Sequence, residues 1–385
     1  MKQMKLFAIT NRAIFPIQMI FLLNSCGIAL WIPRIPDVKA NLGLSLLEIS
    51  LGFFAMPAGT ILGFMAAPAV IKRLGQRLAS AYVGALFLVV FILPSFAWNL
   101  PSLALALFVS GLSVATIEVA MNAKASQIQE QSGQNIMSRC HGFWSIGSTL
   151  GALTGGLFAQ AGFSFASQQL IVEPILAAAT IWFGFQLQAD VAKQESSGPS
   201  FSLPSAAILA LCLMPLGCML AEGAMMEWSA IFAREVILAS PWLTAVTFAT
   251  FAMAMAVGRL TGDWVTHAFG MRRTLVVSAL LSCLGLLVFA TAGRLGVAIP
   301  AAAVVGLGVA NVYPIAMTLA GRFPGQQAEN GVASVAFVAF TAFLVGPPVI
   351  GSIGHILGLP FALALIAPVG LLPVFLLWSG RLKVA

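Results

Sequence analysis

Long apolar stretches, separated by short polar connections, follow one another along the whole chain. No Asp, Glu, Lys or Arg occurs in the 40 positions between Arg77 and Glu118, and His355 alone interrupts the uncharged stretch between Asn330 and Arg381. A helix needs about 20 mainly apolar residues to cross the hydrocarbon core of a bilayer, so each of these two stretches holds two crossings. The pattern predicts an all-α membrane protein that crosses the bilayer many times.

Twelve transmembrane helices are predicted in this way. They cover residues 13–32, 46–71, 78–98, 100–121, 140–161 and 170–187 in the first half, and 204–232, 243–265, 274–292, 295–320, 332–355 and 359–378 in the second. The polar stretch 190–203, which contains Ser-Ser-Gly-Pro-Ser, has the composition of a flexible linker. The expected organisation is an N-terminal six-helix bundle (1–189), a cytoplasmic linker (190–203) and a C-terminal six-helix bundle (204–385).

The two predicted bundles are related by an internal repeat. An offset of 195 residues, without gaps, aligns glycines and their neighbours across spans two to five and eight to eleven. The matched positions are Gly63 with Gly258, Gly75 with Gly270, Arg77 with Arg272, Gly111-Leu112 with Gly306-Leu307, Val114-Ala115 with Val309-Ala310, Gly151 with Gly346 and Gly156 with Gly351. Because each copy has six spans, both copies enter the membrane in the same direction. A parallel repeat of this kind is typical of transporters.

Composition and charge set the environment of these helices. Charged residues make up 8% of the 385 residues, against roughly a quarter in a soluble domain, which excludes a water-soluble surface. Of the 19 Lys and Arg residues, fifteen lie at predicted cytoplasmic ends when the N-terminus is inside. Both termini are therefore expected in the cytoplasm. The net charge of +7 is explained by this orientation in a lipid bilayer and does not indicate a nucleic-acid partner.

Twelve spans, the repeat and basic Gly-centred loops together resemble the major facilitator superfamily. Its loop signature is partly present: the first copy has Lys72 where the signature has an acid, and the second has Arg259 and Asp263 one helical turn apart. Within the superfamily, four stretches are similar to the fucose permease-like group, in particular its bacterial inner-membrane permeases. These stretches are GLSVATIEVAMN (111–122), MSRCHGFWSIG (137–147), EGAMMEWS (222–229) and NVYP (311–314).

The resemblance implies a secondary active transporter that works by alternating access in the bacterial inner membrane. Proton-linked sugar importers of this group have a carboxylate in the fourth span that matches Glu118. They also have an acid in the first span, and residues 27–33 here contain none. In the repeat, Glu222 of the seventh span matches Gly27 of the first span, so Glu222 is predicted to replace that acid.

Ionisable groups inside a membrane are functional candidates because desolvating a charge is expensive. Glu118 and Glu222 are therefore the predicted proton-coupling residues, with Arg139 and His141 as possible counter-charges for Glu118. The alternative for Glu118 is a structural pair that pins the fourth span to the fifth.

Polar and aromatic side chains in the spans are the candidates for solute recognition. His141 and Trp144 share a helix face, where an indole can stack on a sugar ring while polar atoms bind its hydroxyls. The predicted substrate-binding residues are Asn24, Asn122, His141, Trp144, Asn311 and Tyr313. For the amides, hydrogen bonds between helices are the alternative, and for His141 a solvated helix end.

Charged residues near the predicted membrane surfaces are the candidates for gates. They are Arg34, Arg139, Glu227, Arg259 and Asp263. Arg34 with Asp37 makes either an outer gate or a solvated loop, Glu227 beside Trp228 is interfacial or gating, and Arg259 with Asp263 latches the cytoplasmic face.

The leading hypothesis is a proton-coupled symporter of a small polar solute, such as a sugar. The first alternative is a proton-driven exporter of drugs or metabolites, which a lining rich in Phe and Met would favour. The second is a membrane sensor that has the fold but does not transport. The sequence offers no nucleophile–base pair and no metal-ligand spacing, and its five cysteines are unpaired apolar residues. We expect no enzyme activity, cofactor or metal, and a monomer.

Overall fold

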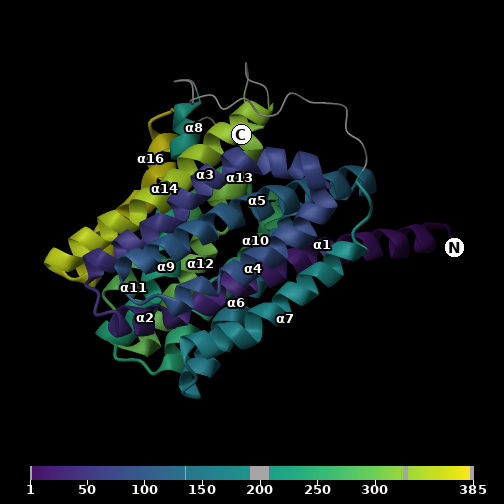
Figure 1. The fold of residues 1–385 in the computed structure, drawn as a ribbon. Coiled ribbons are helices and arrows are strands. Elements are labelled where there is room, and N and C mark those ends of the chain that lie inside the picture. Colours follow the sequence, from purple (N-terminus) through teal and green to yellow (C-terminus); the bar gives the residue numbers. More distant parts are fainter. Residues whose placement is uncertain (1, 135, 191–207, 322, 324–327, 382–385) are drawn as a thin grey trace. The chain divides into compact units, whose positions relative to one another are not determined.

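The computed structural model of the chain contains helices and no strand in the residues that it describes (Figure 1). These residues are 2–134, 136–190, 208–321, 323 and 328–381, and the side chains of 2–13, 328–330, 332 and 333 lie outside the description. The α-helices are α1 (Lys2–Trp31), α2 (Ile35–Asn41), α3 (Leu46–Leu78), α4 (Gly84–Val90), α5 (Leu100–Ser132), α6 (Met137–Gln160), α7 (Phe165–Gln186), α8 (Leu209–Leu213), α9 (Leu216–Ile231), α10 (Pro241–Phe269), α11 (Met271–Ala290), α12 (Leu295–Val309), α13 (Val312–Ala320), α14 (Ala328–Leu357), α15 (Leu359–Ile366) and α16 (Leu372–Trp378).

Ten helical stretches within the described ranges are long and apolar enough to cross a membrane. Large apolar side chains point outward from them, among them Met65, Trp182 and Trp378, which are 79%, 68% and 84% exposed. Such a surface is stable only against lipid or another apolar partner. The prediction of an all-α, multi-pass membrane protein is confirmed.

The predicted spans 46–71 and 78–98 lie in a single stretch, Leu46–Phe96, of 51 residues. Gly75 interrupts the regular helix within it, with φ 77° and ψ 164°. A side chain at this φ would be strained, so glycine is needed here. A five-residue π-helix, Ala79–Val83, follows before α4 begins.

The predicted connection between residues 121 and 140 is largely helical, because α5 continues to Ser132. Asn99 caps the beginning of α5 and accepts a hydrogen bond from the Ser102 backbone N–H. Gly133 ends the helix in the left-handed region with φ 64°. The prediction placed the end of this span at the end of the apolar stretch. The α5 helix continues beyond that point with mainly polar residues.

The predicted span 295–320 is divided into α12 and α13 at Ala310 and Asn311. Pro314 explains the break, because its ring clashes with the carbonyl of the residue four positions earlier, Ala310. Asn311 thereby occupies the N-cap position of α13.

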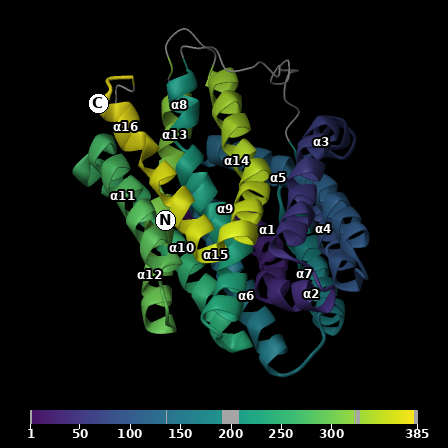
Figure 2. The same cartoon turned by 90° about the vertical axis from the view of Figure 1, so that its left-hand side faces the viewer.

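The chain divides into two compact units. Unit 1 comprises Met1–Leu44, Leu51–Val191 and Ser240–Ala249, and unit 2 comprises Ser45–Ser50, Ala192–Ala239 and Thr250–Ala385. In unit 1, α1 packs along α6 and α7, and α4 packs on α7 and α5 (Figure 1). In unit 2, α11 packs along α12, and α14 along α9 (Figure 2). Of the predicted linker 190–203, residues 191–203 lie outside the described residues.

Three glycines bring α6 against the backbone of α1. A Cβ on Gly155 would lie 2.6 Å from the carbonyl oxygen of Leu30, and Gly147 and Gly151 approach the carbonyls of Leu22 and Cys26 still more closely. Both series advance four residues at a time, so the contact continues along one face of each helix. Close packing of small residues of this kind holds α1 and α6 together.

The packing of α3 on α5 in unit 1 is matched by the packing of α10 on α12 in unit 2. A Cβ on Gly63 would lie 2.7 Å from Ala115 Cβ, and one on Gly258 would lie 2.6 Å from Ala310 Cβ. Two further features recur at the same offset of 195 residues. A Cβ on Gly111 would meet the carbonyl oxygen of Met56, and one on Gly306 would meet that of Phe251. Gly75 and Gly270 both have a positive φ, of 77° and 81°. The glycines aligned in the sequence repeat therefore make equivalent contacts within each unit.

These contacts predict matched effects of substitution. Gly111→Ala and Gly306→Ala each place a methyl group against a backbone carbonyl, and we expect each to lower the free energy of unfolding by about 1–3 kcal/mol through overpacking. Thermal unfolding of the purified protein in detergent checks this. Gly293→Ala is the control, because a Cβ there meets nothing within 4 Å. Equal melting temperatures for all three variants would contradict the packing described.

Candidate functional site

A buried ion pair joins α9 and α10 in unit 2. Arg259 Nη2 lies 3.2 Å from Glu222 Oε1 and 3.4 Å from Oε2, and both side chains are 11% exposed. Charges in an apolar interior are stable only when paired, because either one alone is poorly solvated. The structure thus brings together a predicted proton-coupling residue and a predicted gating residue. Asp263, the expected neighbour of Arg259, is exposed on α10.

Asn311 and Tyr313 lie on the helices next to this pair. The Asn311 side-chain oxygen occupies the place that a Cβ on Gly262 would need, and Gly262 is one turn from Arg259 on α10. Tyr313 packs on a cluster formed by Met219 of α9 with Ala339 and Ala342 of α14. Four of the six residues predicted in the seventh, eighth and tenth spans therefore lie on neighbouring helices: Glu222, Arg259, Asn311 and Tyr313.

Glu118 of α5 is a half-buried carboxylate in unit 1. Among the described residues, no cation lies within ion-pair distance of it and no side chain donates to it. Asn122 Nδ2 donates to the Glu118 backbone carbonyl at 2.9 Å, and Arg139 Nη2 donates to Gln134 Oε1 at 3.0 Å. The expected counter-charge from Arg139 is therefore absent in this conformation, as is the structural ion pair between the fourth and fifth spans.

His141 and Trp144 lie on one face of α6, as their spacing predicts. Both rings make edge-on contacts with Phe21 of α1, at centroid distances of 5.5 Å and 6.5 Å. Both residues are half-buried, which leaves part of each ring accessible. A hydrogen bond of 2.6 Å between Ser25 and Ser148 joins the same two helices.

Asn24 lies inside the helix packing of unit 1. It is 1% exposed, and its Nδ2 donates to the carbonyl of Ile20 on its own helix at 3.0 Å. The side chain lies against Gly84, beside Thr180 of α7. Asn24 is thus enclosed by its neighbours in this conformation, and its role in substrate binding stays a prediction.

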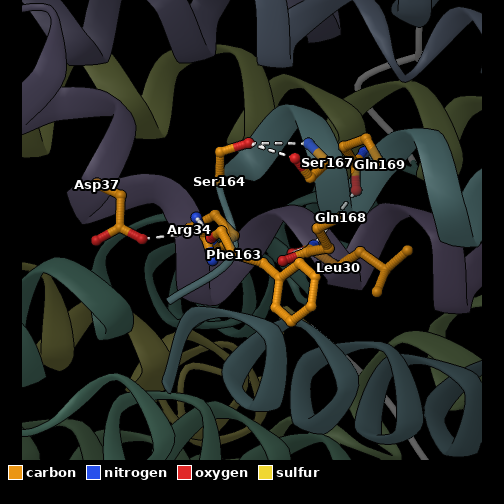
Figure 3. A network of polar contacts seen from close by, with 8 residues as sticks. All are labelled: Leu30, Arg34, Asp37, Phe163, Ser164, Ser167, Gln168 and Gln169. Carbon is orange, nitrogen blue, oxygen red and sulfur yellow. Dashed lines mark hydrogen bonds and ion pairs between the residues drawn. The ribbon is translucent and has the colours of Figure 1, made fainter. Parts of the chain in front are cut away.

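Arg34 is buried at the end of the first span (Figure 3). Its Nε lies 3.1 Å from Asp37 Oδ2, its Nη2 donates to the carbonyl of Phe163 at 2.9 Å, and its guanidinium lies over the Phe165 ring. The side chain is 5% exposed, so the alternative of a solvated loop is wrong. Arg34 connects this end of the first span to the connection between α6 and α7.

Glu227 is half-buried on α9, and the neighbouring Trp228 is completely buried. The expectation that Glu227 is interfacial or gating stays a prediction.

Two charged groups were missed from the sequence. Lys124 of α5 is 1% exposed, and its Nζ donates to Asp190 at 2.9 Å and to Gln127 at 2.7 Å. Asp190 also accepts the backbone N–H of Arg77 at 3.1 Å. The loop after the second span has Lys72 where the family signature has an acid. The carboxylate of Asp190, which follows the sixth span, thus contacts this loop.

The second missed group is Glu173 of α7, which is completely buried. It lies inside the predicted span 170–187. Glu118 was selected because ionisable residues inside a span are functional candidates, and the same rule selects Glu173. Among the described residues, no group of three or more His, Cys, Asp or Glu is placed to hold a metal ion.

Apolar helices long enough to span a bilayer, with ionisable residues buried among them, define an integral membrane protein. The chain is 29% identical over 352 residues to an uncharacterised MFS-type transporter of Yersinia pestis, which covers 90% of both chains. It is 27% identical over 337 residues to an uncharacterised transporter of Sinorhizobium fredii, covering 86% of this chain and 88% of that one. It is 28% identical over 356 residues to the membrane protein MosC of Rhizobium meliloti, covering 91% and 86%. No family model matches the chain.

Solved transporters have the same fold. The nucleoside transporter NupG gives a TM-score of 0.71 at 13% identity and covers 96% of this chain and 99% of its own. The fucose:proton symporter FucP of E. coli gives 0.63 at 18% identity, covering 96% and 98%. Together, the similar sequences and folds support a secondary transporter of the major facilitator type. They also confirm the prediction that the chain is not an enzyme.

Proposed function

We propose that the chain is a proton-coupled symporter that moves a small polar solute by alternating access across the bacterial inner membrane. The observation that carries this proposal is Glu118, a carboxylate inside a membrane span with no cation beside it among the described residues. Ionised, it is poorly solvated there and costs several kcal/mol. When the transport cycle opens the site to water, the carboxylate exchanges its proton, so proton binding and release at Glu118 accompany the cycle.

The Glu222–Arg259 pair gives this cycle a second element that responds to a proton. When Glu222 is ionised, the pair holds α9 against α10. A proton on Glu222 removes the attraction and leaves Arg259 without this partner, which favours another arrangement of the helices. A switch of this kind needs two arrangements that are close in free energy and a local charge that biases them.

The solute in this proposal is a sugar or a molecule that contains one. Two features support it: the half-buried His141 and Trp144, whose rings suit the C–H face of a sugar, and the amides and phenol that suit hydroxyl groups. The proposed polar contacts are Asn122, Asn311 and Tyr313. The solved proteins with this fold include a nucleoside transporter and a fucose:proton symporter, and both kinds of solute contain a sugar ring. The fucose permease-like group is the proposed subgroup.

The proposed architecture has twelve crossings in two six-helix bundles, joined by the linker 190–203, with both termini in the cytoplasm. The equivalent glycine contacts at the repeat offset and the interruption at Gly75 support it. The 24-residue helix α6 is the proposed fifth crossing. Arg34, Arg139, Glu227, Arg259 and Asp263 are proposed to act at gates, and the proposed functional form is a monomer.

The test measures external pH in lightly buffered, de-energised cells that express the protein, as sugars and nucleosides are added one at a time. We expect the medium to become more alkaline with at least one solute, because each molecule that enters brings a proton with it. Cells without the protein, and cells with the Glu118→Gln variant, should give flat traces. A flat trace for the wild type with every solute would contradict sugar–proton symport and favour the exporter alternative.

A further inference from the structure

Glu173 is a carboxylic acid enclosed completely within unit 1. It lies on α7, which packs against α1 and α4, and its exposed fraction is 0%. Gln169 Nε2 donates to Glu173 Oε1 at 3.3 Å, and Glu173 Oε2 has no hydrogen-bond partner among the described residues. A buried oxygen atom without a donor is unfavourable for an anion.

The groups around Glu173 are uncharged. A Cβ on Gly27 of α1 would lie 2.9 Å from Glu173 Oε2 and would also meet Leu88 of α4, so the carboxyl group fits only because residue 27 is glycine. Among the described side chains of α1, the titratable group that faces it is the thiol of Cys26. The α4 helix, Gly84–Val90, contains no ionisable residue.

The described residues of the remaining elements packed on α7 place no cation beside Glu173 either. The π-helix Ala79–Val83 contributes Tyr82, whose ring contacts Phe185 toward the other end of α7. In α6, the ionisable residues Arg139, Cys140 and His141 lie in its first turns, remote from the α6–α7 connection near which Glu173 is placed. A neutral, protonated acid suits these surroundings, whereas a carboxylate does not.

Two amide side chains connect Glu173 with the end of α7 nearest Arg34. Gln168 Nε2 donates to the Leu30 carbonyl at 3.0 Å and lies 3.4 Å from Gln169 Oε1. Gln169 Nε2 is shared between Glu173 and the Phe91 carbonyl, 3.2 Å away. Figure 3 shows this amide pair (Gln168 and Gln169) beside Leu30, next to the Arg34–Phe163 contact. Polar groups thus continue from the beginning of α7 inward to the buried acid.

We propose that Glu173 is a second proton-binding site of the transporter, separate from Glu118 and held in place by the amide pair. The inference rests on the proposed proton coupling. Glu173 binds one proton as a neutral acid when the site is closed, as in this structure. It releases that proton as H⁺ when helix movement opens the space between α1, α4 and α7 to water.

The test is labelling of the full-length protein in lipid vesicles with dicyclohexylcarbodiimide, an apolar reagent that modifies protonated carboxyl groups. Mass spectrometry of the peptide that contains Glu173 gives the extent of modification at a series of pH values. We expect modification at neutral pH that falls at least several-fold as the medium becomes strongly alkaline. The peptide with the exposed Glu48 of α3 is the internal control and should remain unmodified at neutral pH.

Two labelling results would overturn the proposal. Absence of modification at neutral pH would contradict a protonated acid that helix movement opens to the reagent, and unchanged modification at all pH values would mean that its proton is never released. Neither result depends on transport. Failure of this inference is therefore distinguishable from failure of the symport proposal, which the external pH measurement tests.

A transport measurement separates a proton carrier from a structural acid. Glu173→Gln resembles the neutral acid in size and polarity, so we expect it to fold with an unchanged melting temperature. It should nevertheless show a several-fold lower accumulation ratio under an imposed proton gradient. A large loss of stability in this variant would contradict the neutral state, and an unchanged accumulation ratio would contradict the carrier role.

Discussion

The Glu118→Gln variant is expected to lose uphill accumulation of solute completely while solute exchange continues. Gln has the shape of the protonated acid and cannot release a proton, so the site in this variant stays in a form that resembles protonated Glu118. Accumulation driven by a proton gradient should fall to a ratio of about one, which is equilibration without coupling. The measurement is uptake into vesicles with an imposed pH difference, followed by exchange of labelled for unlabelled solute at equal pH.

Glu130→Gln is the matched control for this variant. Glu130 lies on the same helix, α5, and is exposed near its end, so its replacement should leave accumulation as in the wild type. Uphill accumulation that persists in Glu118→Gln would contradict the role of Glu118 as proton carrier. Loss of folding in that variant would equally contradict it, because a neutral side chain of the same size should be tolerated.

Breaking the Glu222–Arg259 pair from one side is expected to destabilise the protein strongly. Glu222→Gln leaves the Arg259 guanidinium buried without its carboxylate, and Arg259→Met leaves the carboxylate without its cation. Each single variant should lower the free energy of unfolding by about 3–5 kcal/mol, whereas the double variant should lose less than the sum. Unfolding of the four proteins in detergent, analysed as a double-mutant cycle, measures the coupling.

Thr261→Ala provides the comparison on α10. Thr261 is exposed, and its hydroxyl donates only locally to the Val257 carbonyl, so far as the described residues show. Its replacement should change the unfolding free energy by at most about 0.5 kcal/mol. Additive effects of the two pair variants, or single effects as small as that of Thr261→Ala, would mean that the buried pair does not hold α9 to α10.

The arrangement of the helices was largely predictable because it depends on features that are local in the sequence. Apolar stretches of sufficient length indicate spans, and glycines at a constant offset indicate equivalent contacts. Gly63 and Gly258 illustrate this, since each packs against the alanine expected from the repeat. The break at Ala310 and Asn311 follows from Pro314, although its position three to four residues before the proline emerged only from the structure.

The polar partners inside the membrane were much less predictable. Arg259 and Glu222 are 37 residues apart, and Arg77 and Asp190 are 113 apart. Which groups meet depends on how each helix is rotated about its axis, and helices that are apolar on all sides give little information about rotation. Glu173 was missed for another reason: it meets the same sequence criterion as Glu118, but only the structure shows its complete burial, its Oε2 atom without a partner among the described residues and its contact with Gly27.

Proton-driven uptake by the purified protein in sealed vesicles tests the central claim most directly. Vesicles that are alkaline inside and acidic outside should accumulate the solute above its external concentration, and collapse of the pH difference should release it. Reversing the gradient should reverse the direction of net movement. Equal concentrations on both sides under every gradient, for a solute that the protein exchanges, would contradict proton coupling.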